Sequence, residues 1–276
     1  MDIANDFIKT QVGLKMNRTK IKIDLSEFPA EFHSIIGSAD IYDSSCSETA
    51  RVYFIDKDKG YFLKSAPKGE LQREAEMTSY FFSKGLAARV LGYVSVDRDW
   101  FLCERVGGED GAMRENLKEP NKLCDAFAEI LRDLHEIDGK DCPVLNRTGE
   151  YLKNAYEGYR KGKFDASIFP AGMGFSNADD AYKYLCENAR YLKNDTLIHG
   201  DYCLPNVMFR DGSFSGFIDL GNSGMGDRHI DLFWGAWTLW YNLKTTEYTD
   251  RFFDAYGREK VDKDVLRLVA AAEVFG

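Results

Sequence analysis

The sequence predicts an α+β protein built from two lobes, one rich in β-sheet and the other mainly helical. Three observations support this prediction: short strand-like runs dominate roughly the first 100 residues, the glycine-rich stretch 107–111 interrupts all regularity, and amphipathic helices follow. We therefore expect an N-terminal lobe at residues 1–103, a hinge or linker at 104–111 and a C-terminal lobe at 112–276. The 276 residues, of which 44% are apolar, supply enough material for both cores.

The N-terminal lobe is expected to contain a hairpin, a helix and two further strands. Runs rich in aromatic and β-branched residues at 51–55 and 61–65 flank a polar turn that ends at Gly60, which is typical of a β-hairpin. The next segment, 70–84, repeats apolar side chains on one helical face and stops at Gly85. Two more strand-like runs complete the lobe, at 89–96 and 100–106.

Helices are expected to make up most of the C-terminal lobe. In the first, at 120–137, the apolar side chains share one face, as a helix packed on a core requires: Leu123, Phe127, Ile130, Leu131 and Leu134. Ser176 and Asp179 resemble a capping box at the start of another helix. The remaining pattern predicts helices at 148–160, 178–192, 228–243, 247–256 and 262–274.

Composition narrows the function classes. The net charge is −9, from 36 basic and 45 acidic residues without a dense Lys/Arg cluster, which disfavours nucleic-acid and anionic-membrane partners and favours a cationic substrate. Six cysteines without a CxxC pair predict reduced thiols. The N-terminus lacks the pattern of a signal peptide, and no apolar run approaches the roughly 18 residues of a membrane span, so we expect a cytoplasmic protein.

The segment 197–221 carries residues suited to phosphoryl transfer. Asn206 comes five residues after Asp201, and Asp219 comes thirteen after Asn206 and precedes a Leu-Gly pair. Protein kinases use the same Asp-to-Asn interval, followed by a magnesium-binding Asp. Gly200 permits a tight turn before Asp201, which is the candidate base or hydroxyl-orienting group. Asn206 and Asp219 offer hard oxygen ligands for Mg²⁺, and we interpret His199 as structural.

Nucleotide-binding residues are expected mainly in the N-terminal lobe. Lys64 lies in a strand and Glu74 in the following helix, the order in which kinases pair a phosphate-orienting lysine with a glutamate. No glycine-rich loop precedes Lys64; the polar stretch 42–50 stands there, and its serines could approach phosphate oxygens. The hinge backbone could meet the adenine edge, with the nucleotide between the lobes. The serines are Ser45 and Ser47, and the hinge residues are Glu104 and Val106.

These motifs resemble those of a known family. HGDYCLPNVMF, SGFIDLGNSGMGDRHIDL and CSETARVYFI are similar to the aminoglycoside 3'-phosphotransferases, which are bacterial antibiotic-resistance kinases. The resemblance implies a protein-kinase-like fold with a five-stranded antiparallel sheet and a helix in the N-lobe, and Mg²⁺-dependent transfer of the γ-phosphate of ATP to a sugar hydroxyl. It also implies that Asp201 is catalytic, that Asn206 and Asp219 bind Mg²⁺, that Lys64 and Glu74 position phosphate, and that Glu104 and Val106 form the hinge.

The acceptor residues match the family less well. Aminoglycosides are polycations, and Glu273 aligns with a carboxylate position through which the family binds them. The segment 165–175 contains a single carboxylate, Asp165, and Glu247 aligns with another acidic position only approximately. Asn222 stands where an arginine is common. Four aromatic residues at helical spacing we interpret as core: Trp234, Trp237, Trp240 and Tyr241.

We therefore predict a kinase for the 3'-hydroxyl of kanamycin- or neomycin-type aminoglycosides, using ATP or GTP and acting as a monomer or weak dimer. A metabolic kinase of the same fold, acting on choline, an amino alcohol or a sugar, is the alternative. A nucleotide-binding pseudokinase is a further alternative, although the base and both metal ligands are present. A protein kinase is disfavoured, because no Ala-Pro-Glu motif follows Asp219.

Overall fold

The structure, a computed structural model, describes residues 18–45, 50–167, 169 and 175–276. The chain forms two compact units: a sheet unit, Met1–Asn116 with Pro205–Gly221, and a helical unit, Leu117–Leu204 with Asn222–Gly276. The α+β class predicted from the sequence is confirmed. Residues 205–221, however, belong to the first unit, whereas the division inferred from the sequence places them in the C-terminal lobe.

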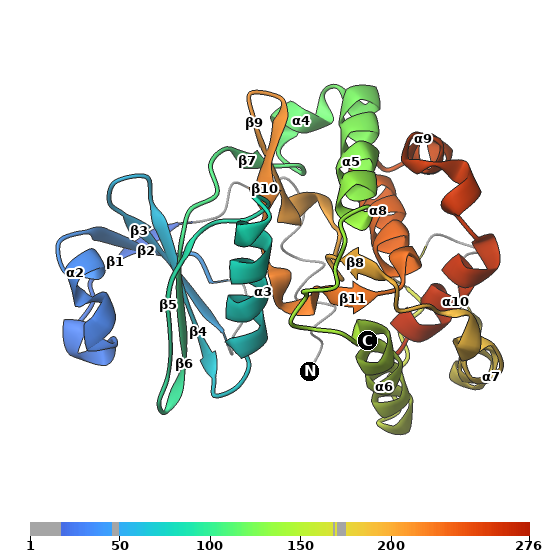
Figure 1. Cartoon of the computed structure of the whole chain (residues 1–276), viewed down its shortest axis with the longest axis horizontal. Coiled ribbons are helices and arrows are strands. Elements are labelled where there is room, and N and C mark those ends of the chain that lie inside the picture. Colours follow the sequence, from blue (N-terminus) through green and yellow to red (C-terminus); the bar gives the residue numbers. More distant parts are fainter. Residues whose placement is uncertain (1–17, 46–49, 168, 170–174) are drawn as a thin grey trace. The chain divides into compact units, whose positions relative to one another are not determined.

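The sheet unit contains six strands, each antiparallel to its neighbours, in the order β1-β2-β3-β4-β6-β5 (Figure 1). The expectation of five strands is corrected to six, because β1 pairs with β2 at the sheet edge. A three-residue strand is too short to produce a readable alternation in the sequence. The strands are β1 (Thr19–Ile21), β2 (Asp40–Asp43), β3 (Arg51–Asp56), β4 (Tyr61–Pro67), β5 (Val90–Ser95) and β6 (Arg98–Glu104).

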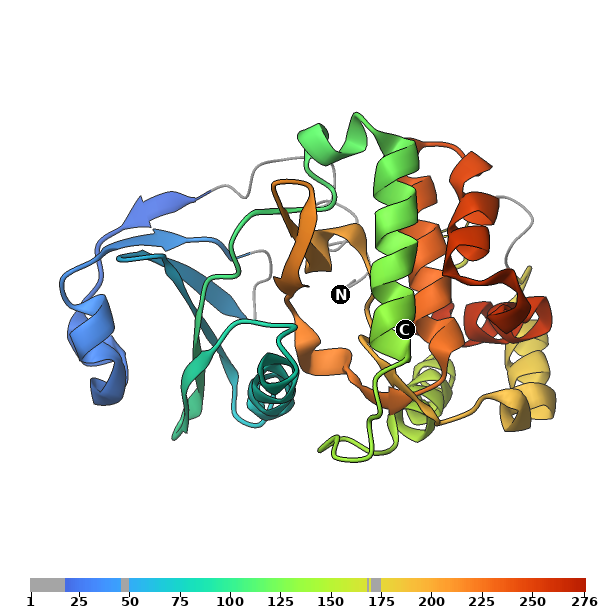
Figure 2. The same ribbon diagram turned by 45° about the horizontal axis from the view of Figure 1, so that its top comes forward.

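Each face of this sheet carries its own apolar cluster. On one face, Leu63 of β4 packs with the segment that contains η1 (Leu25–Glu27), η2 (Ala30–Phe32) and α2 (His33–Ile36). On the other, Ala66 of β4 packs with Ala75 of α3 (Gln72–Ser83). Figures 1 and 2 show α2 and α3 on opposite sides of the strands. Because side chains alternate along a strand, Lys64 shares its face with Ala66 and therefore points toward α3.

A second, three-stranded sheet belongs to the same unit. It has the order β10-β9-β7 and is formed by β7 (Glu109–Asp110), β9 (Val207–Arg210) and β10 (Ser213–Phe217). A parallel bridge between Ala87 and Phe217 ties β10 to the segment that follows α3. This sheet places the ends of the segment 205–221, and thus Asn206 and Asp219, in the sheet unit.

The helical unit consists of helices around a small two-stranded sheet, β8 (Thr196–Ile198) with β11 (Gly224–Gly226). Figures 1 and 2 show α5 and α8 side by side. The expected helices are present, but α7 begins after Asn177, which accepts a hydrogen bond from the N–H of Asp180 at 2.8 Å, so Ser176 is not the cap. The helices are α4 (Arg114–Leu117, at the junction of the units), α5 (Pro120–His135), α6 (Arg147–Arg160), α7 (Ala178–Asn188), α8 (Arg228–Leu243), α9 (Glu247–Tyr256) and α10 (Lys263–Glu273). Four short 3₁₀ turns, η3 (Ala189–Tyr191), η4 (Leu204–Asn206), η5 (Leu220–Asn222) and η6 (Arg258–Lys260), complete the described elements.

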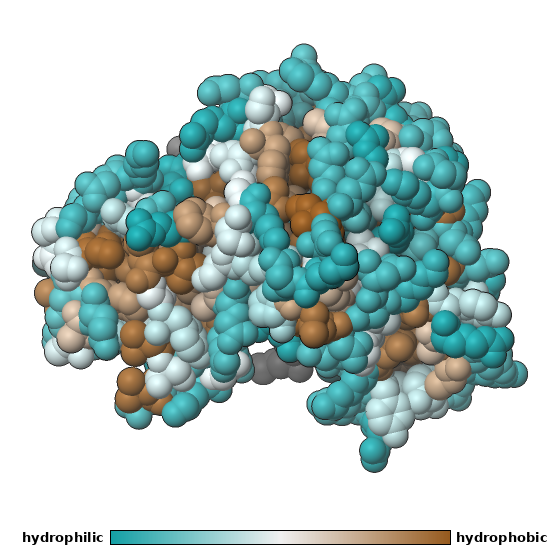
Figure 3. All heavy atoms as spheres, in the orientation of Figure 1, coloured by the Kyte–Doolittle hydropathy of each residue, from teal (hydrophilic) through white to brown (hydrophobic). Residues whose placement is uncertain are grey.

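The core of the helical unit is formed by α6, α7, α8 and α10. Trp234 and Trp237 pack against it, but both side chains remain half-buried, so the core interpretation of the aromatic stripe holds only in part. On the face shown in Figure 3, hydrophobic residues gather over the strands of the sheet unit, whereas hydrophilic ones cover most of the rest. None of the helices in the described ranges combines the length and the hydropathy that crossing a lipid bilayer requires. The five described cysteines are free thiols.

Candidate active site

Lys64 lies between two carboxylates within the sheet unit. Its Nζ donates to Oε1 of Glu74 at 2.6 Å and forms an ion pair with Oδ1 of Asp219. The side chains of Lys64 and Glu74 are 19% and 11% exposed, whereas that of Asp219 is 48% exposed. Of the two carboxylates, Asp219 is therefore the one that a ligand can reach.

The charges of this group depend on one another. Burial opposes the charge of Lys64, but the attraction of Asp219 and Glu74 outweighs burial and raises the pKa of Lys64, so the side chain remains an ammonium ion. Burial also raises the pKa of Glu74, and the positive charge of Lys64 acts against that effect. The arrangement fixes a cation between two carboxylates, and the contact of Lys64 with Glu74 is the one that the sequence pattern predicts.

Asn206 and Asp219 meet the requirements of a magnesium site. The N–H of Ile218 donates to the backbone carbonyl of Asn206 at 3.1 Å, which holds the two segments together, and Asp219 has a left-handed backbone with φ of 57°. Among the described residues, no three His, Cys, Asp or Glu side chains gather as a metal site. Mg²⁺ usually takes one or two protein oxygens and completes its shell with phosphates and water, so this donor pair fits it.

Three of the four serine and hinge residues expected to contact the nucleotide lie within the described part of the chain: Ser45, Glu104 and Val106. The hydroxyl of Ser45 accepts from the N–H of Val52 at 2.9 Å and so closes the connection between β2 and β3; Ser47 lies outside the described residues. Glu104 ends β6, where its side chain is exposed and its N–H donates to the carbonyl of Arg89 at 2.9 Å. Val106 follows, with a buried side chain.

Asp201 lies in the helical unit, in the turn that follows β8. The chain enters this turn through Gly200, whose φ is 80° and whose position leaves no room for a Cβ, which would clash with the carbonyl oxygen of Asn222. The N–H of Asp201 donates to Nδ1 of His199 at 3.3 Å, and its carbonyl accepts from the N–H of Cys203 at 2.9 Å. His199 is fully buried, which supports its interpretation as a structural residue.

Asp231 of α8 holds the same turn by two hydrogen bonds and forms a third with His135 of α5. Its Oδ2 and Oδ1 accept from the N–H groups of His199 and Gly200, each at 2.7 Å. Oδ2 also lies 3.1 Å from Nε2 of His135. Because a carboxylate only accepts, Nε2 carries the hydrogen, and Nδ1 of His135 accepts from the hydroxyl of Tyr256 at 2.9 Å. Burial lowers the pKa of His135, so the ring is neutral.

Asp231 and His135 were not predicted from the sequence. The available signal was Asp231 in the first turn of a very apolar helix, since a carboxylate buried there requires partners. His135 ends the buried face of α5, where its spacing matches that of core residues and gives no sign of a polar network.

Glu273 ends α10 and receives two hydrogen bonds at one oxygen. The hydroxyl of Tyr151 and Nε1 of Trp234 each lie 2.9 Å from Oε1. Burial raises the pKa of Glu273 to about 7; the two hydrogen bonds lower it, and the negative charge of Asp201 raises it. Glu273 thus lies within electrostatic range of the candidate base.

The structure brings one of the other predicted substrate residues near Glu273. The N–H of Asp165 donates to the carbonyl of Val274 at 2.8 Å, although the Asp165 carboxylate accepts from the N–H and hydroxyl of Ser167. Glu247 opens α9 beyond the C-terminal end of α8, whereas Glu273 contacts Trp234, about 14 Å earlier along the axis of α8. The structure therefore does not bring Glu247 to the other two carboxylates.

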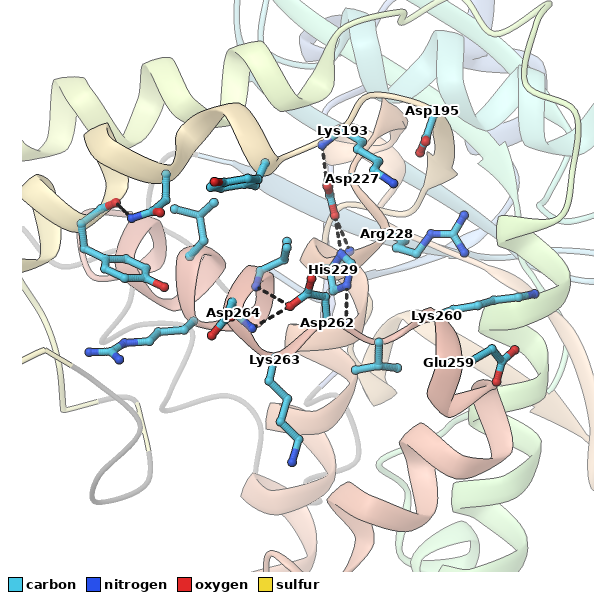
Figure 4. Close-up of a pocket in the computed structure, with 17 residues that line it drawn as sticks. Lys193, Asp195, Asp227, Arg228, His229, Glu259, Lys260, Asp262, Lys263 and Asp264 are labelled. Carbon is cyan, nitrogen blue, oxygen red and sulfur yellow. Dashed lines mark hydrogen bonds and ion pairs between the residues drawn. The ribbon is translucent and has the colours of Figure 1, made fainter.

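A pocket of about 1150 Å³ in the helical unit contains none of the predicted site residues (Figure 4). Asp227 accepts from the N–H groups of Lys193 at 2.6 Å and His229 at 2.8 Å, and Asp262 accepts from the N–H of Asp264 at 2.9 Å. These bonds cap α8 and α10, so both carboxylates already have structural roles.

Comparison with known proteins identifies relatives over nearly the whole chain. The phosphotransferase enzyme family matches residues 46–269. A Lactococcus lactis protein named "Probable aminoglycoside 3'-phosphotransferase" is 46% identical over 94% of this chain and 99% of its own length. The aminoglycoside 3'-phosphotransferase of Niallia circulans is 28% identical over 90% of this chain and 97% of its own.

Solved structures agree with these matches. A type VIII aminoglycoside-3'-phosphotransferase has a TM-score of 0.66 and 25% identity, covering 82% of this chain and 88% of its own. The aminoglycoside phosphotransferase APH(3'')-Id of Streptomyces rimosus, solved with ADP and streptomycin, has a TM-score of 0.73 and 20% identity, covering 92% and 99%. At that identity the second likeness concerns the fold, which is the protein-kinase-like fold expected from the sequence.

Proposed function

Because the chain belongs to the phosphotransferase enzyme family, it is an enzyme that transfers phosphate to an alcohol group, and we propose that its acceptor is an aminoglycoside. The donor is ATP, with GTP as an alternative, and the acceptor hydroxyl is the 3'-hydroxyl of a kanamycin- or neomycin-type compound, in line with the names of its relatives. The observation that carries the proposal is the contact of Lys64 with both Glu74 and Asp219.

The sheet unit supplies the nucleotide-binding residues. Lys64, held in place by Glu74, orients the nucleotide phosphates, and the hinge backbone at Glu104 and Val106 receives the adenine. Asn206 and Asp219 would hold Mg²⁺, which when bound neutralises charge on the β- and γ-phosphates. Asp219 would then exchange its ion pair with Lys64 for the metal, and its 48% exposure permits that exchange.

The helical unit supplies the acceptor chemistry. Asp201 accepts a hydrogen bond from the acceptor hydroxyl and takes its proton as the oxygen attacks the γ-phosphorus and ADP leaves. Burial, and next the negative charge of Asp201, raise the pKa of the Cys203 thiol well above its ordinary value, so this neighbour stays neutral and does not compete as a base. Glu273 provides a carboxylate for an ammonium group of the substrate, and Asp165 is a second candidate at the adjacent segment.

Replacing the candidate base tests this assignment. Asp201→Ala is expected to lower kcat by about 10³-fold while changing the Kd of ADP, measured by titration calorimetry, by no more than about twofold. Asp138→Ala, at an exposed carboxylate paired with Lys140, is the matched control and should retain full activity. Near-normal turnover of Asp201→Ala would rule out its role.

The acceptor is tested by ADP release from Mg²⁺-ATP with a panel of alcohols. Kanamycin and neomycin should stimulate turnover strongly, whereas choline, simple amino alcohols and neutral sugars should not. Clear turnover on one of these other alcohols without stimulation by aminoglycosides would favour the metabolic-kinase alternative. Nucleotide binding without turnover on any alcohol would favour the pseudokinase. We further propose that the enzyme is cytoplasmic. We also propose that it acts as a monomer or weak dimer, and light scattering of the purified protein would test this oligomeric state.

A further inference from the structure

Two donors from different helices meet at one oxygen of Glu273. Tyr151 comes from α6 and Trp234 from α8, and both reach Oε1 at 2.9 Å. The other oxygen, Oε2, accepts no hydrogen bond from the part of the chain that the structure describes. The Glu273 side chain is only half-buried, so the carboxylate is held on one side and accessible on the other.

We propose that Tyr151 and Trp234 are positioning residues for Glu273, which hold Oε1 so that Oε2 receives an ammonium group of the acceptor. This inference rests on the proposed function, because the ligand is the cationic aminoglycoside. A half-buried carboxylate that receives hydrogen bonds only at Oε1 has an unused acceptor, and an ammonium group is the partner that best compensates its charge. Neither residue was predicted from the sequence to have a role in the site.

The two donors differ in the number of acceptors that each can reach. The indole N–H of Trp234 can only donate, and Oε1 is its acceptor. The Tyr151 hydroxyl has one hydrogen for two acceptors, because the carbonyl oxygen of Val269 also lies 3.1 Å away. Loss of the Trp234 donor should therefore affect Glu273 more than loss of the Tyr151 hydroxyl.

The groups that face Glu273 make its charge sensitive to these donors. Burial, followed by the charge of Glu273, raises the pKa of Tyr151 well above its ordinary value, so the phenol stays neutral and can always donate. Asp201 adds negative charge, and Lys163 lies nearby at the carbonyl of Gly276. Both hydrogen bonds favour the ionised carboxylate, so removing either one shifts the Glu273 equilibrium toward the neutral form, which binds an ammonium group poorly.

Steady-state kinetics from pH 5.5 to 9 test the role in binding. Trp234→Phe should raise the KM of kanamycin about tenfold near pH 7, with kcat and the KM of ATP changed by no more than about twofold, and move the acid limb of kcat/KM up by about one pH unit. Tyr151→Phe should show the same pattern with a smaller shift. Tyr191→Phe, at an exposed tyrosine, is the matched control and should change none of these values. A KM that rises equally at every pH would indicate a purely structural role and would overturn the inference.

A direct titration of Glu273 separates this inference from the proposed function. The carboxyl carbon of ¹³C-labelled Glu273, assigned by its absence in Glu273→Gln, should titrate about one unit higher in Trp234→Phe than in the unmodified protein. An unchanged titration in both positioning variants would overturn the inference and leave the proposed function intact. Absence of aminoglycoside turnover in the unmodified enzyme would overturn the proposed function and, with it, the ligand assigned here.

Discussion

The two units hold their candidate catalytic side chains by different means. In the sheet unit, Lys64, Glu74 and Asp219 hold one another through ion pairs between side chains. In the helical unit, Asp231 holds the turn of Asp201 through backbone N–H groups. The charges of a nucleotide can replace an ion pair, whereas nothing in the proposed reaction can replace the acceptor of the N–H groups of His199 and Gly200. We infer that the nucleotide side can rearrange on binding and that the base must stay fixed.

Between the two units, the largest combined loss of activity and stability is expected where the turn of Asp201 loses the carboxylate that holds it. Asp231→Asn places an amide donor against the N–H groups of His199 and Gly200, because only one of its two terminal atoms can accept. We expect kcat to fall by about 10²-fold or more and the free energy of unfolding to fall by about 3–5 kcal/mol. Steady-state kinetics and urea denaturation would measure the two effects.

Asp227→Asn is the matched control for that variant. Asp227 is equally buried on the same helix, but its partners are the N–H of Lys193 and both the backbone and the ring of His229, none of which belongs to the turn. It should lose stability and keep its kcat. Equal losses of kcat in the two variants would show that Asp231 acts only through global stability.

Replacing the lysine of the ion-paired group should change the free energy of unfolding less than Asp231→Asn does. Its kinetic effect should be limited to the parameters for ATP. Lys64→Met removes the cation between Glu74 and Asp219, so the KM of ATP should rise and kcat/KM for ATP should fall by about 10²-fold. The free energy of unfolding should change by only about 1–2 kcal/mol, since Glu74 can take up a proton. Lys59→Met, at an exposed lysine of the same hairpin, is the control. A loss of stability as large as that of Asp231→Asn would contradict the difference between the units.

Local patterns in the sequence predicted the parts of the fold and site that depend on local structure. The hairpin and α3 are read from alternation and amphipathicity, and their order places Lys64 and Glu74 ten residues apart on elements that must pack together. The contact that distinguishes a catalytic lysine from a surface one, with Asp219 on a segment 155 residues away, has no local signal. The motif around Asp219 indicated a magnesium ligand and did not predict this contact with Lys64.

The remaining features depend on tertiary burial, which a single sequence does not record. Asp231 stands in the first turn of a very apolar helix, but the sequence does not show that its carboxylate accepts hydrogen bonds from the turn of Asp201. The helical spacing of Trp234 predicts a core residue, because spacing alone does not distinguish a half-buried indole that donates a hydrogen bond from a fully buried one. Glu247 was expected at the site on the basis of approximate alignment alone, and the geometry of α8 separates it from Glu273.

The smallest expected effect compares two glutamates with raised pKa values, one in each unit. Glu74 has Lys64 as its counter-charge, but no cation forms an ion pair with Glu273 among the described residues. Burial raises the pKa of Glu273 from the ordinary 4.5 to about 7, so between these values the folded state holds a proton that the unfolded chain has lost. Stability therefore falls as pH rises through this window, and the penalty is complete above it.

Glu273→Gln should remove that penalty and keep an oxygen for Tyr151 and Trp234 to donate to. At pH 8 the variant should unfold with a free energy about 1–2 kcal/mol higher than the unmodified protein, a figure reduced for solvent screening at the half-buried side chain, and at pH 4 the two should coincide. Glu74→Gln should show no such gain, because the substitution takes an ion-pair partner away from the buried ammonium group of Lys64. Chemical denaturation at the two pH values measures this comparison, and a gain of equal size in both variants would mean that Lys64 does not distinguish the two carboxylates.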